Sequence, residues 1–228
     1  GNRARNQQRL PTAASCRSEF RRRVYCTMPL VSVSLDVPEV SLPDKVSRLI
    51  DDAVQRIDEF VESRHADPIV AFVPCDFAQV YGALLEIDRR QLAPGGRFAE
   101  WGCGVGAVTC LAALLGLDAV GIEIELPLVA ESEQLARDHG CDAEFVAASF
   151  LPPGTEDLSD QQVDVAWLRS DGPDAYALLE LEPDDFDLVF AYPWPGTAVN
   201  IPWPGRSTIA TQGSLTAVHA VDDDGPPF

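Results

Sequence analysis

The sequence predicts an α/β fold, a doubly wound and mostly parallel β-sheet with helices on both faces. Segments typical of strands alternate with segments typical of helices from Phe98 to Tyr192, and this alternation is typical of parallel sheets. The composition, 46% hydrophobic and 23% charged over 228 residues, fits one sizeable globular domain. No apolar run approaches the roughly 18 residues that cross a bilayer, so we expect no membrane-spanning segment.

Residues 28–95 are predicted to form a strand followed by two helices that cover the core. Apolar residues recur at helical spacing from Pro43 to Ser63, with the proline in the first turn. A second helix is expected from Asp76, whose side chain can cap its amino end, to Ile87. A Leu-Ala-Pro-Gly-Gly turn then separates these helices from the core.

Residues 96–195 are predicted to form the core of the domain. A strand that ends near Glu100 leads into a glycine-rich loop. The helices beyond the loop have recognisable ends, because Gly116 follows the first while Pro127 and Gly140 bracket the second. The elements expected after the loop are, in chain order, helix Ala107–Leu115, strand Ala119–Glu123, helix Leu126–His139, strand Phe145–Ala148 and strand Asp187–Tyr192.

Two segments interrupt this order. Residues 151–185 are an acidic insertion rich in Pro and Gly, with one helical candidate at Asp174–Leu181, and loops of this length are often lids or binding loops. Residues 196–228 are expected to be irregular apart from one weak hairpin, at Thr208–Thr211 and Ser214–Val221. A truncation or a reading-frame change near Gly196 would make this tail non-native and would leave the sheet incomplete at its C-terminal end.

The net charge of −19 is unevenly distributed along the chain. Residues 1–27 carry seven arginines and one acid, whereas the remainder carries 10 basic and 35 acidic residues, a balance of −25. Such an acidic field repels phosphate backbones, so a nucleic-acid substrate is disfavoured. We expect residues 1–27 to be a basic, disordered extension, and a basic anchoring arm is the alternative.

The six cysteines are scattered, without a C-x-x-C pair or partnering histidines. This spacing predicts neither a metal site nor a disulfide framework, so we expect reduced thiols and a cytoplasmic protein. Cys103 lies within the glycine-rich loop and is interpreted as a small loop residue rather than a nucleophile.

The glycine-rich loop and the acids on either side of it are the most informative pattern in the chain. The segment reads Glu-Trp-Gly-Cys-Gly-Val-Gly from Glu100 to Gly106, and Glu123 follows 17 residues after the last glycine. Glycines allow sharp turns and the close approach of a ligand, and the next helix points its unpaired N–H groups at the same place. Glu123, at the end of the second strand, is placed to accept hydrogen bonds from a ribose diol. No G-K-[ST] phosphate-binding sequence is present.

These residues resemble the first motif of the class I S-adenosylmethionine-dependent methyltransferases, an acid followed by G-x-G-x-G. The resemblance covers roughly residues 76–195 and implies a Rossmann-like fold, S-adenosylmethionine as cofactor and methyl transfer as activity. It places the loop around the methionine part of the cofactor, Glu100 near the methionine amino group, and Glu123 with Ile124 at the ribose. The loop residues that it implies are Gly102, Cys103, Gly104 and Gly106.

Two positions depart from the pattern of that family. Where the family usually has an acid that meets the adenine amino group, this chain has Ser149 followed by Phe150. A serine can accept a hydrogen bond and a phenylalanine can stack on a purine, so both are predicted to contact adenine. The fourth core strand ends in Tyr192-Pro193-Trp194, where amino-group methyltransferases have Asn/Asp-Pro-Pro-aromatic. Amine or base methylation is therefore not implied, and Trp194 either packs over the strand end or lines the acceptor site.

Few residues are candidates for a lid or for the acceptor site. Besides Tyr192, Pro193 and Trp194, the candidates are Asp76 and Tyr81, which precede the core. Asp76 is better explained as a helix cap and Tyr81 as a packing residue. No catalytic base, oligomeric state or acceptor is assigned beyond an expected small molecule or protein.

Two other functions remain open at this point. A nicotinamide-dependent oxidoreductase is one, because G-C-G-V-G-A also fits the looser dinucleotide-binding pattern G-x-G-x-x-[GA]. Glu100 argues against it, because this acid would face a pyrophosphate. The other is a catalytically incomplete cofactor-binding protein, which the unusual strand end and tail would explain.

Overall fold

The computed structural model describes residues 30–37, 39–64, 75–151, 171–192, 208–211 and 216–220. The expected extension at residues 1–27 lies outside these ranges. So do Pro193, Trp194 and most of the predicted insertion.

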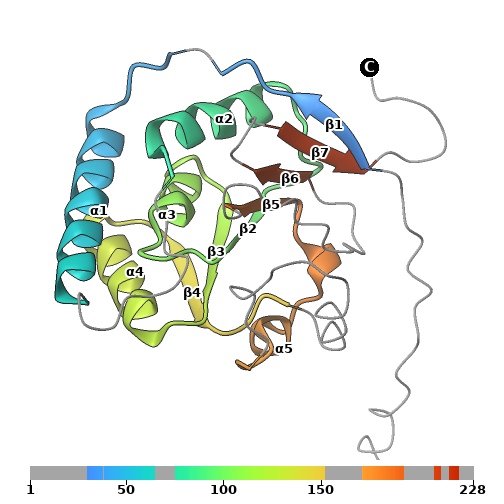
Figure 1. Cartoon of the computed structure of the whole chain (residues 1–228). Helices are drawn as coiled ribbons and strands as arrows, with labels where there is room; N and C mark the ends of the chain where they lie inside the picture. The colour runs from blue at the N-terminus through green and yellow to red at the C-terminus, as the bar shows by residue number, and fades with distance from the viewer. Residues whose placement is uncertain are drawn as a thin grey trace, which may run out of the picture.

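A seven-stranded sheet in the order β1-β7-β6-β5-β2-β3-β4 forms the centre of the molecule (Figure 1). The pairs β2–β3, β3–β4, β2–β5 and β5–β6 are parallel, whereas β7 runs antiparallel to both β6 and β1. The predicted α/β fold with a mostly parallel sheet is therefore confirmed. The strands are β1 Leu30–Ser34, β2 Arg97–Trp101, β3 Asp118–Glu123, β4 Ala143–Ala147, β5 Leu188–Ala191, β6 Thr208–Thr211 and β7 Thr216–Ala220.

The tail continues the sheet, contrary to the expectation that the fold is incomplete at its C-terminal end. The hairpin expected there is confirmed, because β6 and β7 pair in antiparallel fashion. β6 also pairs with β5, and β7 pairs with β1 from the beginning of the chain, so β5 is not an exposed edge. The polar composition of the tail was misleading because threonine is a good strand former, and pairing with the preformed β5 satisfies the backbone.

Among the described residues, four helices lie on one side of the sheet and one short helix lies on the other (Figure 1). The first group buries a core against Phe98, Leu188 and Phe190, whereas residues of α5 share a second core with Ala99 and Val189. Within the described ranges, none of the helices has the length and apolar character that crossing a membrane requires. The helices are α1 Asp44–Ser63, α2 Phe77–Arg89, α3 Ala107–Leu114, α4 Leu126–His139 and α5 Ala175–Leu179, and the 3-10 turn η3 is Pro183–Asp185.

The helix ends follow the capping residues seen in the sequence. The Asp76 side chain accepts a hydrogen bond from Gln79 N at 3.0 Å and so caps α2. α4 begins next to Pro127 and ends before Gly140, which has the left-handed φ of 57° expected of a helix-terminating glycine. These local signals explain why the predicted bounds of both helices are close to those observed.

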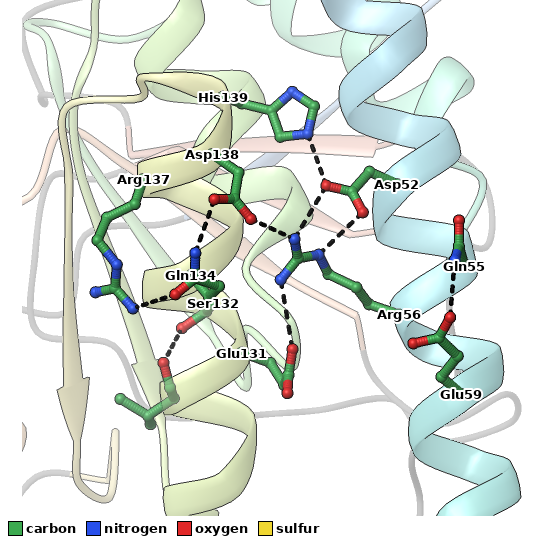
Figure 2. Close-up of polar contacts among 11 residues, drawn as sticks. Asp52, Gln55, Arg56, Glu59, Glu131, Ser132, Gln134, Arg137, Asp138 and His139 are labelled. Carbon is green, nitrogen blue, oxygen red and sulfur yellow. Dashed lines mark hydrogen bonds and ion pairs between the residues drawn. The ribbon is translucent and has the colours of Figure 1, made fainter.

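α1 is joined to α4 by the Arg56 network, which consists of Arg56, Asp52, Glu131, Asp138 and His139 (Figure 2). The Arg56 guanidinium lies 3.1 Å from a carboxylate oxygen of Asp52 on its own helix. It also reaches across to α4, where it lies 3.5 Å from Glu131 and 2.6 Å from Asp138. His139 Nε2, on α4, lies 2.8 Å from the other oxygen of Asp52. A basic side chain of each helix therefore contacts an acidic side chain of the other.

Candidate functional site

The carboxyl ends of β2, β3, β4 and β5 meet at one edge of the sheet, called here the carboxyl edge. From β2 the chain proceeds outward through β3 and β4 on one side, and then returns to β5 on the other side. This reversal between β3 and β5, on either side of β2, is a topological switch point, where open α/β sheets bind ligands. Four features follow the strand ends at this edge. They are the glycine-rich loop after β2, the turn after β3, Ser149 after β4 and Tyr192 after β5.

The glycine-rich loop makes a tight turn from β2 into α3. The amides of Gly102 and Cys103 donate to the carbonyl oxygen of Ile122 on β3, at 2.8 and 3.1 Å. Gly106 N donates to Cys103 O at 2.8 Å and closes the turn. Three glycines in the loop have positive φ, namely Gly102 at 70°, Gly104 at 56° and Gly106 at 78°.

Gly106 is required for steric reasons as well as for its backbone conformation. A Cβ atom at this position would lie 2.6 Å from the Phe145 ring and 2.6 Å from Ser132 Cβ. A side chain here would therefore push α3 away from β4 and α4, and would change the shape of the loop that precedes it.

Glu123, at the end of β3, ties the glycine-rich loop to the next turn. Its side chain is buried, and its Oε2 atom accepts a hydrogen bond from Gly104 N at 3.0 Å. Its Oε1 atom accepts from Ile124 N at 2.8 Å and from Glu125 N at 3.0 Å. Burial raises the pKa of Glu123, while these three amides favour its charged form.

Glu100, on β2, caps α3 from outside the helix. The N-cap residue, Gly106, has no side chain that could do so. Instead, Glu100 Oε2 accepts a hydrogen bond from Thr109 N at 2.7 Å and a second one from the Thr109 hydroxyl. Burial, with a smaller contribution from nearby Glu123, raises the pKa of Glu100 to about 8.

Thr109 is a site residue that our sequence analysis missed. It is fully buried in the first turn of α3, nine residues after Glu100. A threonine at the third position of a helix that follows an acid-containing strand was the available signal. It was too weak to use, because the contact depends on how the helix packs against the strand.

The two buried carboxyl groups give the site its electrostatic character. Among the described residues, no Lys or Arg side chain forms an ion pair with Glu100 or Glu123. The carboxylates take the N–H groups of Gly104 and Thr109, which are the kind of donor that binds phosphate at other glycine loops. The site therefore favours a cation or a neutral hydroxyl donor over a pyrophosphate.

Ser149 and Phe150, after β4, already have partners within the protein. Ser149 Oγ accepts a hydrogen bond from Leu151 N at 3.2 Å. The Phe150 ring stacks on Trp101, with centroids 5.2 Å apart and planes inclined by 7°, and its carbonyl accepts from the Tyr176 hydroxyl at 2.9 Å. One face of the Phe150 ring is therefore occupied, which leaves at most the other face for a ligand.

Part of the acidic insertion lies against this region. Ser149 N donates to Pro173 O at 2.8 Å, and Ala175 N donates to Ser149 O at 3.2 Å. A Cβ atom on Gly172 would lie 2.9 Å from Ile124 Cδ1, so this glycine packs directly on the residue after Glu123. The contact was not foreseen, because the insertion has no local pattern that indicates where it docks.

The remaining sequence candidates have structural roles in the described part of the chain. Asp76 serves as the cap of α2, and Tyr81 is buried in the core, as the preferred interpretations had it. Tyr192 follows β5 and packs against the main core. Cys103 is buried, and burial raises its pKa well above the usual value, so its thiol stays protonated near neutral pH.

Comparisons with known proteins find similar solved structures but no family. No protein-family model matches the chain, and no curated protein matches it. Several of the similar structures are methyltransferases. Three of them are an RNA methyltransferase from Salinibacter ruber, a tRNA (uracil-54, C5)-methyltransferase from Pyrococcus abyssi, and the magnesium protoporphyrin IX methyltransferase of Synechocystis, each with bound S-adenosylhomocysteine.

These similarities are too low to decide the family or the function. The identities are 16%, 18% and 18%, and the TM-scores are 0.43, 0.33 and 0.35, in the same order. The matches cover 68%, 55% and 70% of this chain and 98%, 24% and 61% of the three structures. Other similar structures are also much longer, and the chain spans 34% and 38% of the length of two of them.

Proposed function

We propose that this chain binds S-adenosylmethionine at the carboxyl edge and transfers its methyl group to a small-molecule or protein acceptor. The observation that carries the proposal is the pair of buried carboxyl groups, Glu100 and Glu123, on either side of a glycine-rich loop at the topological switch point. The structure adds to the sequence motif that both of its acids are buried and that both accept hydrogen bonds from backbone amides.

The residues present fit the polar groups of this cofactor. A sulfonium and an ammonium group are both cations, and carboxylates without counter-ions favour them. A carboxylate has about four lone-pair positions, and Glu123 uses three of them on backbone amides. The remaining lone-pair position of Glu123 could accept one hydrogen bond from a ribose hydroxyl.

The proposal assigns each part of the cofactor to a part of the chain. The loop from Gly102 to Gly106, including Cys103, would surround the methionine part, with Glu100 beside its amino group. Glu123 and Ile124 would hold the ribose, and Ser149 and Phe150 would line the adenine site. Bound S-adenosylmethionine supplies a methyl group that its sulfonium already activates, so the main task of the chain is to hold cofactor and acceptor in line.

The nicotinamide-dependent alternative is disfavoured by the same contacts. A dinucleotide needs free N–H groups for its pyrophosphate at the loop and at the start of the following helix. Here the carboxyl groups of Glu123 and Glu100 occupy Gly104 N and Thr109 N, so these two donors are not available to the phosphates. A catalytically incomplete cofactor-binding protein would share the proposed site and differ only in lacking turnover.

The role of Glu123 can be tested by calorimetry with S-adenosylhomocysteine. We expect Glu123→Gln to weaken binding roughly 10- to 100-fold, because it removes a charged acceptor but keeps one oxygen for the loop amides. Glu144→Gln is the matched control, since Glu144 is exposed on β4, and it should bind like the unaltered chain. Equal affinity in all three proteins would remove the ribose assignment.

A further inference from the structure

We propose that Thr109 is a positioning residue of this site, which holds one oxygen of Glu100 and leaves the other oxygen for a cationic group of the ligand. The inference rests on the proposed function, because the cation is taken to be the ammonium or sulfonium group of S-adenosylmethionine. It goes further by giving a role to a residue outside the glycine motif.

The two oxygens of Glu100 are in different situations. Oε2 receives both donors of Thr109, the amide and the hydroxyl. No described residue donates a hydrogen bond to Oε1, although only 5% of the Glu100 residue is exposed. Oε1 is not among the fully buried polar atoms that lack a partner in the described part of the chain, so this oxygen is the one that a ligand in the site could contact.

Among the described residues, the groups that face Glu100 supply no positive charge. The titratable groups that face it are Glu123 at the end of β3, Cys75 before α2, Cys103 in the loop and Cys110 on α3. One of these is a second carboxyl group and the others are thiols. A bound cation would therefore be the counter-charge of Glu100, and the carboxyl group would release its proton as the cation arrives.

Thr109 sets both the direction and the charge of Glu100 in this arrangement. Its hydroxyl and amide belong to the first turn of α3, which is fixed to the glycine-rich loop, so they orient the carboxyl group relative to the loop. They also favour the charged form of Glu100 against the effect of burial. Removal of the hydroxyl alone should make ionisation harder and should leave the backbone contact in place.

The test is calorimetry of S-adenosylhomocysteine binding between pH 6 and 8.5, in two buffers with different ionisation enthalpies. The proteins are the unaltered chain, Thr109→Val, Thr109→Ser and Glu100→Gln, each checked for folding by circular dichroism. The comparison gives the affinity and the number of protons released at each pH. The ligand's own titration is common to all four proteins and cancels in their differences.

We expect the unaltered chain to bind more tightly as the pH rises toward 8 and to release close to one proton at pH 7. Thr109→Val should move the pH dependence of binding to higher pH by about one unit. A shift of one unit corresponds to about 1.4 kcal/mol, which is close to the contribution of one hydrogen bond to a charged group. Thr109→Ser should restore the original profile, and Glu100→Gln should show neither the pH dependence nor the proton release.

Two results would overturn the inference while leaving the proposed function in place. One is binding by the unaltered chain without proton release, and the other is the same pH profile for Thr109→Val and Thr109→Ser. A folded, unaltered chain that fails to bind S-adenosylhomocysteine at any pH is a different result. It would remove the proposed function itself, and the inference with it.

Discussion

Glu100 and Glu123 are acidic residues that act in the structure as acceptors for backbone amides. Glu100 reaches the first turn of α3, and Glu123 reaches the glycine-rich loop and the turn before α4. Both groups are buried, and the described residues that hold them are backbone amides and the Thr109 hydroxyl, with no salt bridge among those residues. The carboxyl groups thus shape the site in addition to giving it its charge.

The burial of Glu100 predicts an unusual dependence of stability on pH. Its pKa is about 8 in the folded chain and near 4.5 when unfolded, so the folded state binds more protons between these values. The free energy of unfolding should therefore fall as the pH rises from 4.5 to 8, by on the order of 4 kcal/mol, and should level off above 8.

Urea denaturation at pH 5, 6.5 and 8 measures this effect. Glu100→Gln should lose most of the decrease, because an amide cannot ionise, whereas Glu144→Gln at an exposed position should keep it. Because Glu100 and Glu123 interact, the difference between the unaltered chain and Glu100→Gln includes this coupling, whereas Glu144→Gln leaves it in place. Parallel pH profiles for the unaltered chain and Glu100→Gln would show that Glu100 is ionised in the folded state.

At the scale of elements, the Arg56 network fixes α1 to α4. Burial alone would raise the pKa of Asp52, but hydrogen bonds from Arg56 and His139 outweigh it, so the pKa is lowered. Asp52 therefore contributes stability that is lost as the pH falls through its folded pKa. The acidic side chains are 30–43% exposed, so solvent weakens each contact, and the network matters because one guanidinium serves three carboxylates.

Arg56→Met tests the contribution of this network. We expect a loss of about 1–2 kcal/mol in the free energy of unfolding, because three carboxylates are left facing one another without their cation. The matched control is Arg137→Met, which breaks an exposed contact with Glu133 within α4 and should cost less than about 0.5 kcal/mol. Equal losses for the two variants, or a loss that salt does not reduce, would contradict this account.

At the scale of the whole molecule, local signals in the sequence were sufficient to predict the type and bounds of most of the helices and strands near the site. The bounds of α4 follow from Pro127 and Gly140, and the glycine-rich loop follows from its motif. The pairing of β1 with β7 could not be predicted, because it joins residues at opposite ends of the sequence. Its short strands acquire their register only when the rest of the sheet is in place.

In the site too, features that depend on local sequence could be predicted, and features that depend on contacts between distant segments could not. The positions of Glu100 and Glu123 could be predicted, because each stands at the end of a strand beside a loop. Their partners could not, since the Thr109 contact and the packing of Gly172 on Ile124 depend on how separate elements meet. The stacking of Phe150 on Trp101 depends on the same kind of contact, and it limits the role that the sequence suggested for Phe150.

The most direct test of the account is calorimetry of the full chain with S-adenosylhomocysteine and, separately, with NADH. A site with two buried carboxyl groups, neither of them paired with a cation of the described residues, is expected to bind S-adenosylhomocysteine and to reject the pyrophosphate of NADH. Saturable binding of S-adenosylhomocysteine alone is the predicted result. Binding of NADH in its place would contradict the central claim, because it would show that the loop accepts a pyrophosphate despite Glu100 and Glu123.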